Sequence, residues 1–166
     1  MTEAEFKTIF REHKDAVYGF AWRMTGSPAV AEDATQDCFV ALLRDQARFD
    51  GGRGSLRAFL IGVTRNQIRK RWRAEGRWDP IDEDSFVAEP FDAERMETVD
   101  LVAKAVQALP PLQRETLILT EYDEMSLQDV ARAVEAEVGT VKARLHRARE
   151  NLRRMLAPLR RPPCNP

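Results

Sequence analysis

Residues 126–156 contain two short amphipathic stretches that meet at a tight junction, and this feature limits the possible folds most strongly. In the second stretch, apolar residues recur at steps of three and four, which places them along one side of a helix. Basic residues fall away from this apolar seam, with Glu150 as the only acid among them. A helix that buries one side and presents cations on the other is suited to bind phosphates, so we predict that this part of the chain binds nucleic acid. The seam consists of Val138, Val141, Leu145, Ala148, Leu152 and Met155, and the basic face of Lys142, Arg144, Arg147, Arg149, Arg153 and Arg154.

The two stretches fit a helix-turn-helix, in which the second helix enters the major groove of DNA and the first helix braces it. The turn of this motif often uses glycine or another residue that tolerates a left-handed backbone. Here that position falls to Glu135 or Ala136, so either the turn is mildly strained or it closes differently. An amphipathic helix with an ordinary solvated face is the alternative interpretation, and it remains open at this point.

The charges of the chain are unevenly distributed, although the net charge is only −1. Residues 1–78 carry 14 basic and 10 acidic side chains, and residues 101–166 carry 11 and 8. Between them, residues 79–100 carry 1 basic and 9 acidic side chains. Two basic segments therefore flank an acidic bridge, and the net charge conceals this arrangement.

The N-terminal segment is predicted to form a bundle of helices. Apolar residues of period 3.6 over residues 6–24 indicate a first helix, which the Gly-Ser-Pro sequence at residues 26–28 ends. A second helix is predicted from about Pro28 to Arg44, followed by a glycine-rich loop over residues 49–55. Ser55 is a suitable N-cap for a third helix. The buried stripe of that helix would consist of Leu56, Phe59, Leu60 and Val63.

The third helix is expected to leave a row of polar and basic side chains free, with Trp72 among them and Trp78 nearby. Such a surface suits single-stranded DNA, where contacts to the backbone and to the bases combine. An ordinary solvated face is the alternative. The glycine-rich loop lacks the spacing of a nucleotide-hydrolase phosphate loop, but its flexible backbone could enclose a flipped base. The row consists of Arg65, Asn66, Arg69, Lys70, Arg71 and Arg73.

The helical pattern stops near residue 76, and Pro80, Pro90 and the acidic composition predict an extended, flexible linker. Helical periodicity resumes at Val99, is interrupted at residues 110–111 by two prolines, and continues to the helix that Ser126 opens. We therefore predict an all-α fold with two small helical domains. The first covers residues 1–75, the acidic linker residues 76–98, the helix-turn-helix domain residues 99–158, and a tail residues 159–166.

Other parts of the sequence exclude several classes of function. Two cysteines and two histidines do not make a zinc site or a disulfide framework, and we expect no metal, cofactor or catalytic residue. Cys38 falls in an apolar pattern typical of a core cysteine. No stretch reaches the length of a membrane span, so a cytoplasmic location is expected.

Asp33, Gln36 and Asp37 lie on the polar side of the second helix. These residues are either solvated or form a docking surface for a basic protein partner.

Several stretches, taken in order, share the pattern of one family. They are AEDATQDCFVALL, LRAFLIGVTRNQIRKRWR, the acidic linker, and ALPPLQRETLILTEYDEMSLQDVARAVEAEVGTVKARLHRARENLRRML. Together they resemble the group 4, or extracytoplasmic-function (ECF), sigma factors of bacterial RNA polymerase. The resemblance extends from about Phe6 to Leu156, and GTVKARLHRAR combined with LPPLQRE is its most specific part.

The resemblance implies that the first domain is sigma region 2, a helical bundle, and the last is sigma region 4, a helix-turn-helix. It implies docking on core RNA polymerase through Asp33, Gln36, Asp37 and Phe39. It implies capture of the melted −10 strand by Arg53, Gly54, Ser55, Asn66, Arg69 and Lys70. It implies contact with the −35 element by Thr140, Lys142, Ala143, Arg144, Arg147 and Arg149. An anti-sigma factor that covers these surfaces is the further partner that the family implies.

The chain departs from the family at the helix-turn-helix junction. The turn glycine of the family is Glu135 here, and the serine that often begins the recognition helix is Glu137. An acid near the start of that helix could repel phosphate while interacting favourably with the helix dipole.

The sequence therefore predicts a promoter-specificity subunit that directs core polymerase to −35 and −10 elements and aids promoter melting. One alternative is a stand-alone helix-turn-helix regulator that binds duplex DNA without polymerase, and another is a helical adaptor that sequesters a different regulator. A symmetric repressor needs a dimer interface to match paired half-sites, and the sequence offers no spare apolar face for one.

Overall fold

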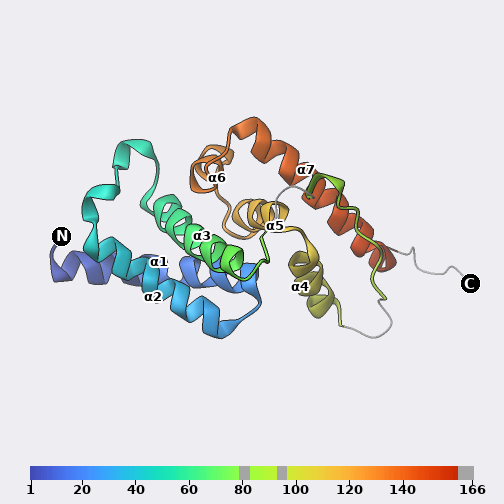
Figure 1. Ribbon diagram of the computed structural model, residues 1–166, viewed down its shortest axis with the longest axis horizontal. Helices are drawn as coiled ribbons and strands as arrows, with labels where there is room; N and C mark the ends of the chain where they lie inside the picture. Colours follow the sequence, from blue (N-terminus) through green and yellow to red (C-terminus); the bar gives the residue numbers. More distant parts are fainter. Residues whose placement is uncertain (79–82, 93–96, 161–166) are drawn as a thin grey trace, which may run out of the picture.

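The computed structural model describes residues 1–78, 83–92 and 97–160, apart from the side chains of Arg53, Asp84 and Arg160. The described residues form helices joined by turns and loops, and none of them lies in a strand, which confirms the predicted all-α fold. Figure 1 shows two groups of helices side by side, α1 to α3 and α4 to α7. Within the described ranges, no helix is long and apolar enough to cross a membrane.

The N-terminal module is a bundle of three α-helices. It consists of α1 (Glu3–Thr25), α2 (Pro28–Arg44) and α3 (Leu56–Ala74), with the short 3₁₀ turns η1 (Gln46–Arg48) and η2 (Gly51–Arg53) between α2 and α3. Each of the three helices packs against the other two. The bundle therefore has the order and boundaries that the apolar periodicity predicts.

Local capping explains where these helices begin and end. Thr2 and Glu5 form a reciprocal capping box at the start of α1, and Gly26 ends that helix with a φ of 68° in the left-handed region. The hydroxyl of Ser27 accepts a hydrogen bond at the start of α2. At the start of α3, the hydroxyl of Ser55 accepts the Ala58 N–H at 3.1 Å, which confirms the predicted cap.

Aromatic side chains form one core of this module. Phe39 of α2 is only 3% exposed, and its ring meets the rings of Phe6 and Phe10 edge-on, with centroids 6.3 and 4.9 Å apart. Cys38 beside it is fully buried, as its apolar setting predicts. Edge-to-face ring pairs of this kind add to the stability gained by burial. Phe39 is therefore a core residue that fixes α2 on α1.

Trp72 and Trp78 are not exposed, and the expectation that Trp72 belongs to a free DNA-facing surface is wrong. They are 3% and 8% exposed, and their ring centroids lie 5.9 Å apart. The guanidinium of Arg114, from the C-terminal module, lies 5.5 Å from the Trp72 ring centroid. The second module covers this end of α3, and helical periodicity alone could not reveal that contact.

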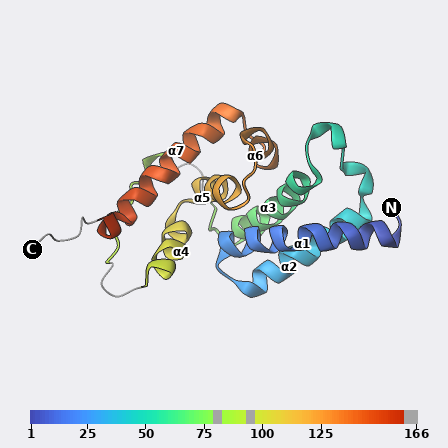
Figure 2. The same cartoon turned by 180° about the vertical axis from the view of Figure 1, so that it is seen from behind.

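The C-terminal module consists of four α-helices and a π-helical turn. They are α4 (Thr98–Ala108), α5 (Pro111–Leu117), the π-helix η5 (Ile118–Tyr122), α6 (Leu127–Ala133) and α7 (Val138–Met155), followed by the 3₁₀ turn η6 (Ala157–Arg160). Figures 1 and 2 show α5 and α6 between α3 and α7, in agreement with the packing of α6 on α3 and of α5 on α7. The second module thus meets the first through its shorter helices.

The apolar seam predicted for α7 is present. Val141, Leu145, Ala148 and Met155 are buried, and the remaining two seam residues are partly buried. The predicted N-cap of α6 is also confirmed, because the Ser126 hydroxyl accepts the Asp129 N–H at 3.1 Å. These features together give a helix-turn-helix with α7 as its second helix.

The segment between the modules is described over residues 76–78 and 83–92, while residues 79–82 and 93–96 of the predicted linker lie outside the described residues. Its 3₁₀ turn η3 (Glu83–Ser85) and the residues after it lie against α5 and α7. The Glu83 carboxylate accepts the N–H groups of Leu112 and Gln113 at 2.8 and 3.1 Å. The flexibility of residues 76–98 stays a prediction, but part of this segment forms a wall of the second module.

We expect Trp72→Ala to lower the free energy of unfolding by about 3–5 kcal/mol, because the change leaves a large cavity in a buried cluster. Trp22→Ala is the matched control, since Trp22 is 44% exposed, and it should cost less than about 1 kcal/mol. Urea unfolding followed by circular dichroism measures both variants. Equal losses for the two tryptophans would contradict the burial described here.

Candidate nucleic-acid interface

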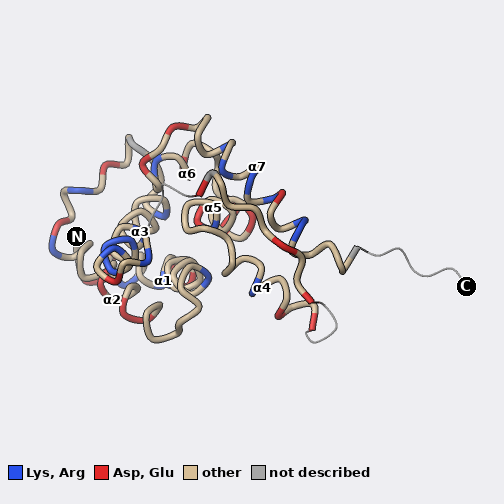
Figure 3. The backbone as a smooth tube through the Cα atoms, turned by 45° about the vertical axis from the view of Figure 1, so that its right-hand side comes forward, with Lys and Arg blue, Asp and Glu red and all other residues tan. Residues whose placement is uncertain are grey.

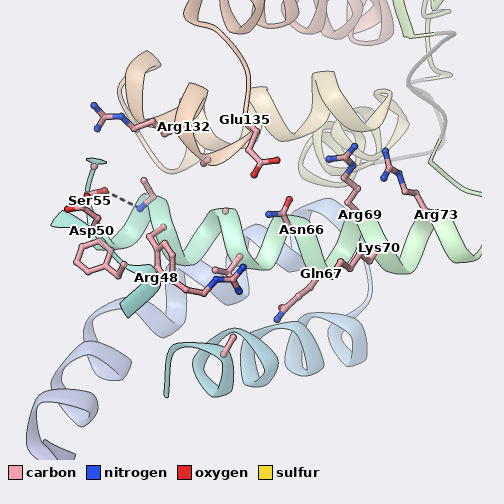
Figure 4. Close-up of a pocket in the computed structure, with 18 residues that line it drawn as sticks. Arg48, Asp50, Ser55, Asn66, Gln67, Arg69, Lys70, Arg73, Arg132 and Glu135 are labelled. Atoms are coloured by element: carbon pink, nitrogen blue, oxygen red, sulfur yellow. Dashed lines mark hydrogen bonds between the residues drawn. The ribbon is translucent and has the colours of Figure 1, made fainter. Parts of the chain in front are cut away.

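A cavity of about 850 Å³ lies along α3 and the glycine-rich loop before it (Figure 4). Loop geometry shapes its rim: the Asp50 carboxylate accepts the Gly52 N–H at 2.9 Å, and Gly54 has a φ of 141° that favours glycine. Gly54, Ser55, Asn66, Arg69 and Lys70, five of the six residues predicted to hold the −10 strand, line it together with other basic and polar groups. Its polar lining includes Arg48, Asp50, Ser55, Asn66, Gln67, Arg69, Lys70, Arg73, Arg132 and Glu135.

The structure brings most of the predicted −10 residues together. Asn66 and Arg69 are half-buried on the cavity wall, Lys70 is exposed beside them, and Ser55 lies at the far end of α3. Figure 4 shows Asn66 and Arg69 on the side of α3 that faces the second module, with Asn66 directed toward Glu135, and Lys70 lower on the helix. The side chain of Arg53 lies outside the described residues.

The charge of this cavity is mixed. Burial, followed by the neighbouring charges of Arg65 and Arg73, lowers the pKa of Arg69, while the carboxylate of Glu135 opposes that shift. Glu135 and Arg132 belong to the helix-turn-helix of the second module. The cations of α3 therefore face an acid from the other half of the chain.

Arg65 is not part of the free basic row, and that expectation is wrong. Its side chain is 5% exposed and donates two hydrogen bonds to the fully buried Glu115 of α5, with N–O distances of 2.9 and 3.2 Å. Burial raises the pKa of Glu115, and the guanidinium of Arg65 counteracts this shift. The polar side of α3 thus includes a residue that is buried against the second module and pairs with it.

The predicted −35 residues lie along the exposed side of α7. Thr140, Lys142 and Ala143 are exposed, whereas Arg144 and Arg147 are half-buried. Figure 3 shows basic positions spaced along this helix. Arg149 is exposed and donates a hydrogen bond to Glu121 of η5 with an N–O distance of 3.0 Å. Lys142 and Arg149 of the predicted basic face are therefore exposed, and Arg149 is paired to an acid of the π-helical turn.

The turn of the helix-turn-helix adopts the left-handed conformation at Glu135, whose φ is 54°. Non-glycine residues reach this region with some strain, which is smaller than for a β-branched residue. Glu137 occupies the N-cap of α7 but makes no capping hydrogen bond with its side chain. The left-handed position of the turn is therefore Glu135 and not Ala136, and the turn is mildly strained.

The predicted polymerase-docking residues separate into two sets. Asp33, Gln36 and Asp37 are exposed on α2 and form an acidic and polar surface. Phe39 faces the aromatic core, so its side chain does not belong to that surface. Phe39 instead fixes the helix that carries the three exposed residues.

A buried polar network in the second module was missed by sequence reasoning. The Asn151 amide donates to Gln113 Oε1 at 2.9 Å and accepts the Ala88 N–H at 3.0 Å, while Gln113 also donates to the Glu83 carbonyl oxygen at 3.2 Å. One signal could have revealed it: Asn151 falls three residues after Ala148 in the phase of the apolar seam. A polar residue in a buried stripe usually has a partner.

The described residues contain no group of three or more histidine, cysteine or acidic side chains arranged to hold a metal ion. Cys38 is buried, its thiol donates to the Leu60 carbonyl oxygen at 3.3 Å, and burial raises the pKa of the thiol to about 11. A thiol with that pKa is a poor nucleophile at neutral pH. Cys38 is therefore a structural residue.

The two modules each match a known family. Residues 9–78 match the family described as Sigma-70 region 2, and residues 100–152 match the family described as Sigma-70, region 4. The chain is 30% identical over 170 residues to the ECF RNA polymerase sigma factor SigW of Bacillus subtilis, covering 93% of this chain and 90% of that relative. The chain belongs to the ECF sigma factors of bacterial RNA polymerase.

Other relatives agree with this ECF assignment. The ECF RNA polymerase sigma factor SigE of Mycolicibacterium smegmatis is 31% identical over 156 residues, which cover 90% of this chain and 60% of that relative. Among solved structures, the fold is similar to the sigma factor RpoE of Bartonella quintana, in complex with the anti-sigma factor NepR. That match has a TM-score of 0.74 and 28% identity, and it covers 95% of this chain and 99% of the other.

The segment that precedes region 4 of this ECF factor should make its stability depend on pH. Burial raises the pKa of Glu83 from 4.5 to about 7, so the folded state binds a proton that the unfolded state has released between these values. The contribution of Glu83 to stability therefore falls as the pH rises through this range. Glu83→Gln keeps an oxygen that accepts the same N–H groups and removes the titration.

We expect the Glu83→Gln variant to be more stable than the wild type above pH 7, by at most about 3 kcal/mol, since one pKa unit corresponds to about 1.4 kcal/mol. The difference should shrink toward pH 4.5, the ordinary value for the carboxyl. Denaturant unfolding at a series of pH values measures it, with Glu89→Gln as an exposed control in the same segment. A difference that is independent of pH would contradict the assignment.

Proposed function

We propose that this ECF sigma factor directs core RNA polymerase to promoters by contacting the −35 element through region 4 and the melted −10 strand through region 2. The best support is that the chain carries two basic surfaces, one on α3 and one on α7. The residues that carry them match Sigma-70 region 2 and Sigma-70, region 4. The subunit itself performs no covalent chemistry. Binding energy alone drives the opening of the duplex.

At the −10 element, the cavity along α3 is the proposed site of strand capture. Gly54 and Ser55 supply its loop rim, and Asn66, Arg69 and Lys70 supply polar and cationic contacts. We also assign Arg53 of the loop to this strand. Extruding a base from the duplex costs a few kcal/mol, and a pocket that binds the extruded base offsets this cost.

At the −35 element, α7 is the proposed recognition helix. Thr140, Lys142, Ala143, Arg144, Arg147 and Arg149 are the residues that we assign to the major groove and its phosphates. Each good bidentate contact to a base edge discriminates by about 1–3 kcal/mol. A small number of such contacts suits a subunit that gains most of its affinity for DNA from the polymerase.

On α2, we assign Asp33, Gln36 and Asp37 to docking on core polymerase, with Phe39 holding the helix from behind. An acidic surface of this kind favours a basic partner and disfavours DNA. Since core polymerase is the partner, the protein would act in the cytoplasm. The similar RpoE was solved with an anti-sigma factor bound, and we propose that an anti-sigma factor likewise restrains this chain.

Transcription in vitro tests the proposal against its alternative. The purified chain, added to core bacterial RNA polymerase and a randomised library of promoter fragments, should produce transcripts with defined start sites that share −35 and −10 sequences. A stand-alone regulator would instead protect duplex DNA without polymerase and initiate no transcript. The family assignment disfavours that alternative.

We expect Arg144→Ala and Arg147→Ala each to reduce initiation at a selected promoter by about 5- to 150-fold, because each change removes a contact in the groove worth about 1–3 kcal/mol. Association with core polymerase, measured by size-exclusion chromatography, should not change. Arg11→Ala, on the other module, removes an equal charge as the control. Loss of association in the α7 variants would refute their assignment to DNA.

The double substitution of Asp33→Lys and Asp37→Lys reverses two charges on α2 and should impair assembly with core polymerase, which the α7 variants leave intact. We expect assembly with core polymerase to fall at least tenfold, since like charges would face the basic partner. Glu3→Lys with Glu12→Lys makes the same change in charge on exposed positions of α1 and should assemble normally. If the α2 double variant assembles as well as the wild type, the docking surface lies elsewhere.

A further inference from the structure

The acidic segment between the modules runs alongside α7, the proposed recognition helix (Figure 1). The N–H groups of Ala88 and Phe91 each donate to an oxygen of α7 at 3.0 Å. Residues 83–92 lie outside both family matches, which cover residues 9–78 and 100–152. The helix that we assign to the −35 element is therefore supported by a segment that belongs to neither matched region.

Glu83 is the buried acid of this segment, with an exposure of 7%. Its Oε1 atom accepts the N–H groups of Leu112 and Gln113 and is thereby fixed at the start of α5. Its Oε2 atom is also buried, but makes no hydrogen bond to any residue that the structure describes. Buried polar atoms usually have a hydrogen-bond partner, so an unpaired carboxylate oxygen requires an explanation from its surroundings.

The surroundings of Glu83 include the proposed −35 surface. A cavity of about 520 Å³ lies between Glu83, the start of α5 and the first half of α7. Four of the six residues that we assign to the −35 element line this cavity, namely Thr140, Ala143, Arg144 and Arg147. The Nη1 atom of Arg144 is buried and likewise has no hydrogen bond to a described residue. A buried acceptor and a buried donor of opposite charge thus line one cavity.

The two groups interact through their charges. Burial raises the pKa of Glu83 to about 7, and the positive charge of Arg144 acts against this increase. Arg114 and Glu115 of α5 also interact electrostatically with Glu83, and Arg147 lines the same cavity from α7. Attraction between charges is stronger at a partly buried site than in water, and a bridging water can transmit a polar contact across such a gap. The carboxylate can therefore restrain the guanidinium without touching it.

We propose that Glu83 is a positioning residue for −35 recognition, and that its carboxylate holds the guanidinium of Arg144 in the orientation that reads the major groove. The inference rests on the proposed assignment of α7 to the −35 element, and it adds to that site a residue from outside region 4. A bidentate contact of arginine with a guanine edge depends on the orientation of the guanidinium plane. Discrimination at the base pair that Arg144 reads should therefore depend on an acid that does not touch DNA.

NMR of the full chain tests the contact without DNA or polymerase. The Nε–H signal of Arg144, identified by its loss in Arg144→Lys, should shift as the pH passes through the pKa of Glu83. The same signal should be independent of pH in Glu83→Gln. His146→Gln is included in both proteins, so that no histidine of α7 adds a shift of its own. An Arg144 signal that responds to pH equally in both proteins, or in neither, would overturn the proposal.

Initiation by the assembled holoenzyme tests the consequence for recognition. Each −35 base pair of a promoter selected from the library is changed in turn, and the loss of initiation is measured. We expect Arg144→Ala to discriminate poorly at one or two base pairs. Glu83→Gln should reduce discrimination at those same base pairs by about threefold or more, a part of the 5- to 150-fold that a whole contact supplies. Glu89→Gln, an exposed position in the same segment, is the matched control and should discriminate as the wild type does.

Two results of this assay would refute the positioning role. One is unchanged discrimination by Glu83→Gln at the base pairs that Arg144 reads. The other is an equal loss at every −35 base pair, because this would indicate a structural role alone. A position-specific loss cannot come from unfolding, since Glu83→Gln is expected to be the more stable protein above pH 7. If the wild type initiates at no promoter, the proposed function itself fails, while NMR still decides whether Glu83 holds Arg144.

Discussion

The ion pair of Arg65 and Glu115 is the interaction on which the relative placement of the two modules depends. Both side chains are almost completely buried, and two hydrogen bonds join them. A buried charge without its partner costs about 3–5 kcal/mol, so each residue strongly requires the other while the modules are in contact. Separation does not carry that penalty, because water then solvates both groups. Such a pair specifies one arrangement of the modules and contributes little net stability relative to modules separated in water.

Buried polar groups also position α7, the second helix of the helix-turn-helix. Asn151 and Gln113 are buried polar residues that bond each other and the backbone of residues 83–88, and Glu83 completes the network at the start of α5. Each unpaired group would cost about 1–3 kcal/mol, so the network holds α7, α5 and the preceding segment in register. Residues 83–88 belong to the acidic segment between the modules, and they pack against α5 and α7 as part of the second module.

The positions of the helices can be predicted from the sequence, but the contacts between the two modules cannot. Apolar periodicity and capping residues such as Ser55 and Ser126 predicted the α-helices closely, because both signals are local. Periodicity tells which face of a helix is polar, but it does not tell what covers that face. Periodicity therefore assigns Trp72 and Arg65 to a free surface, although the second module buries both. Phe39 was assigned to a docking surface by resemblance, whereas its apolar neighbours place it in the core.

The second module places two acids against the cations of α3. Glu135 and Glu115 both face cations of α3 when the modules are in contact. Were α3 to bind phosphates in the same geometry, Glu135 would repel them at close range. Salt at physiological concentration screens exposed charges beyond about 8 Å, but it screens the buried pair much less. The contact between the modules should therefore persist at salt concentrations that weaken nonspecific binding to DNA.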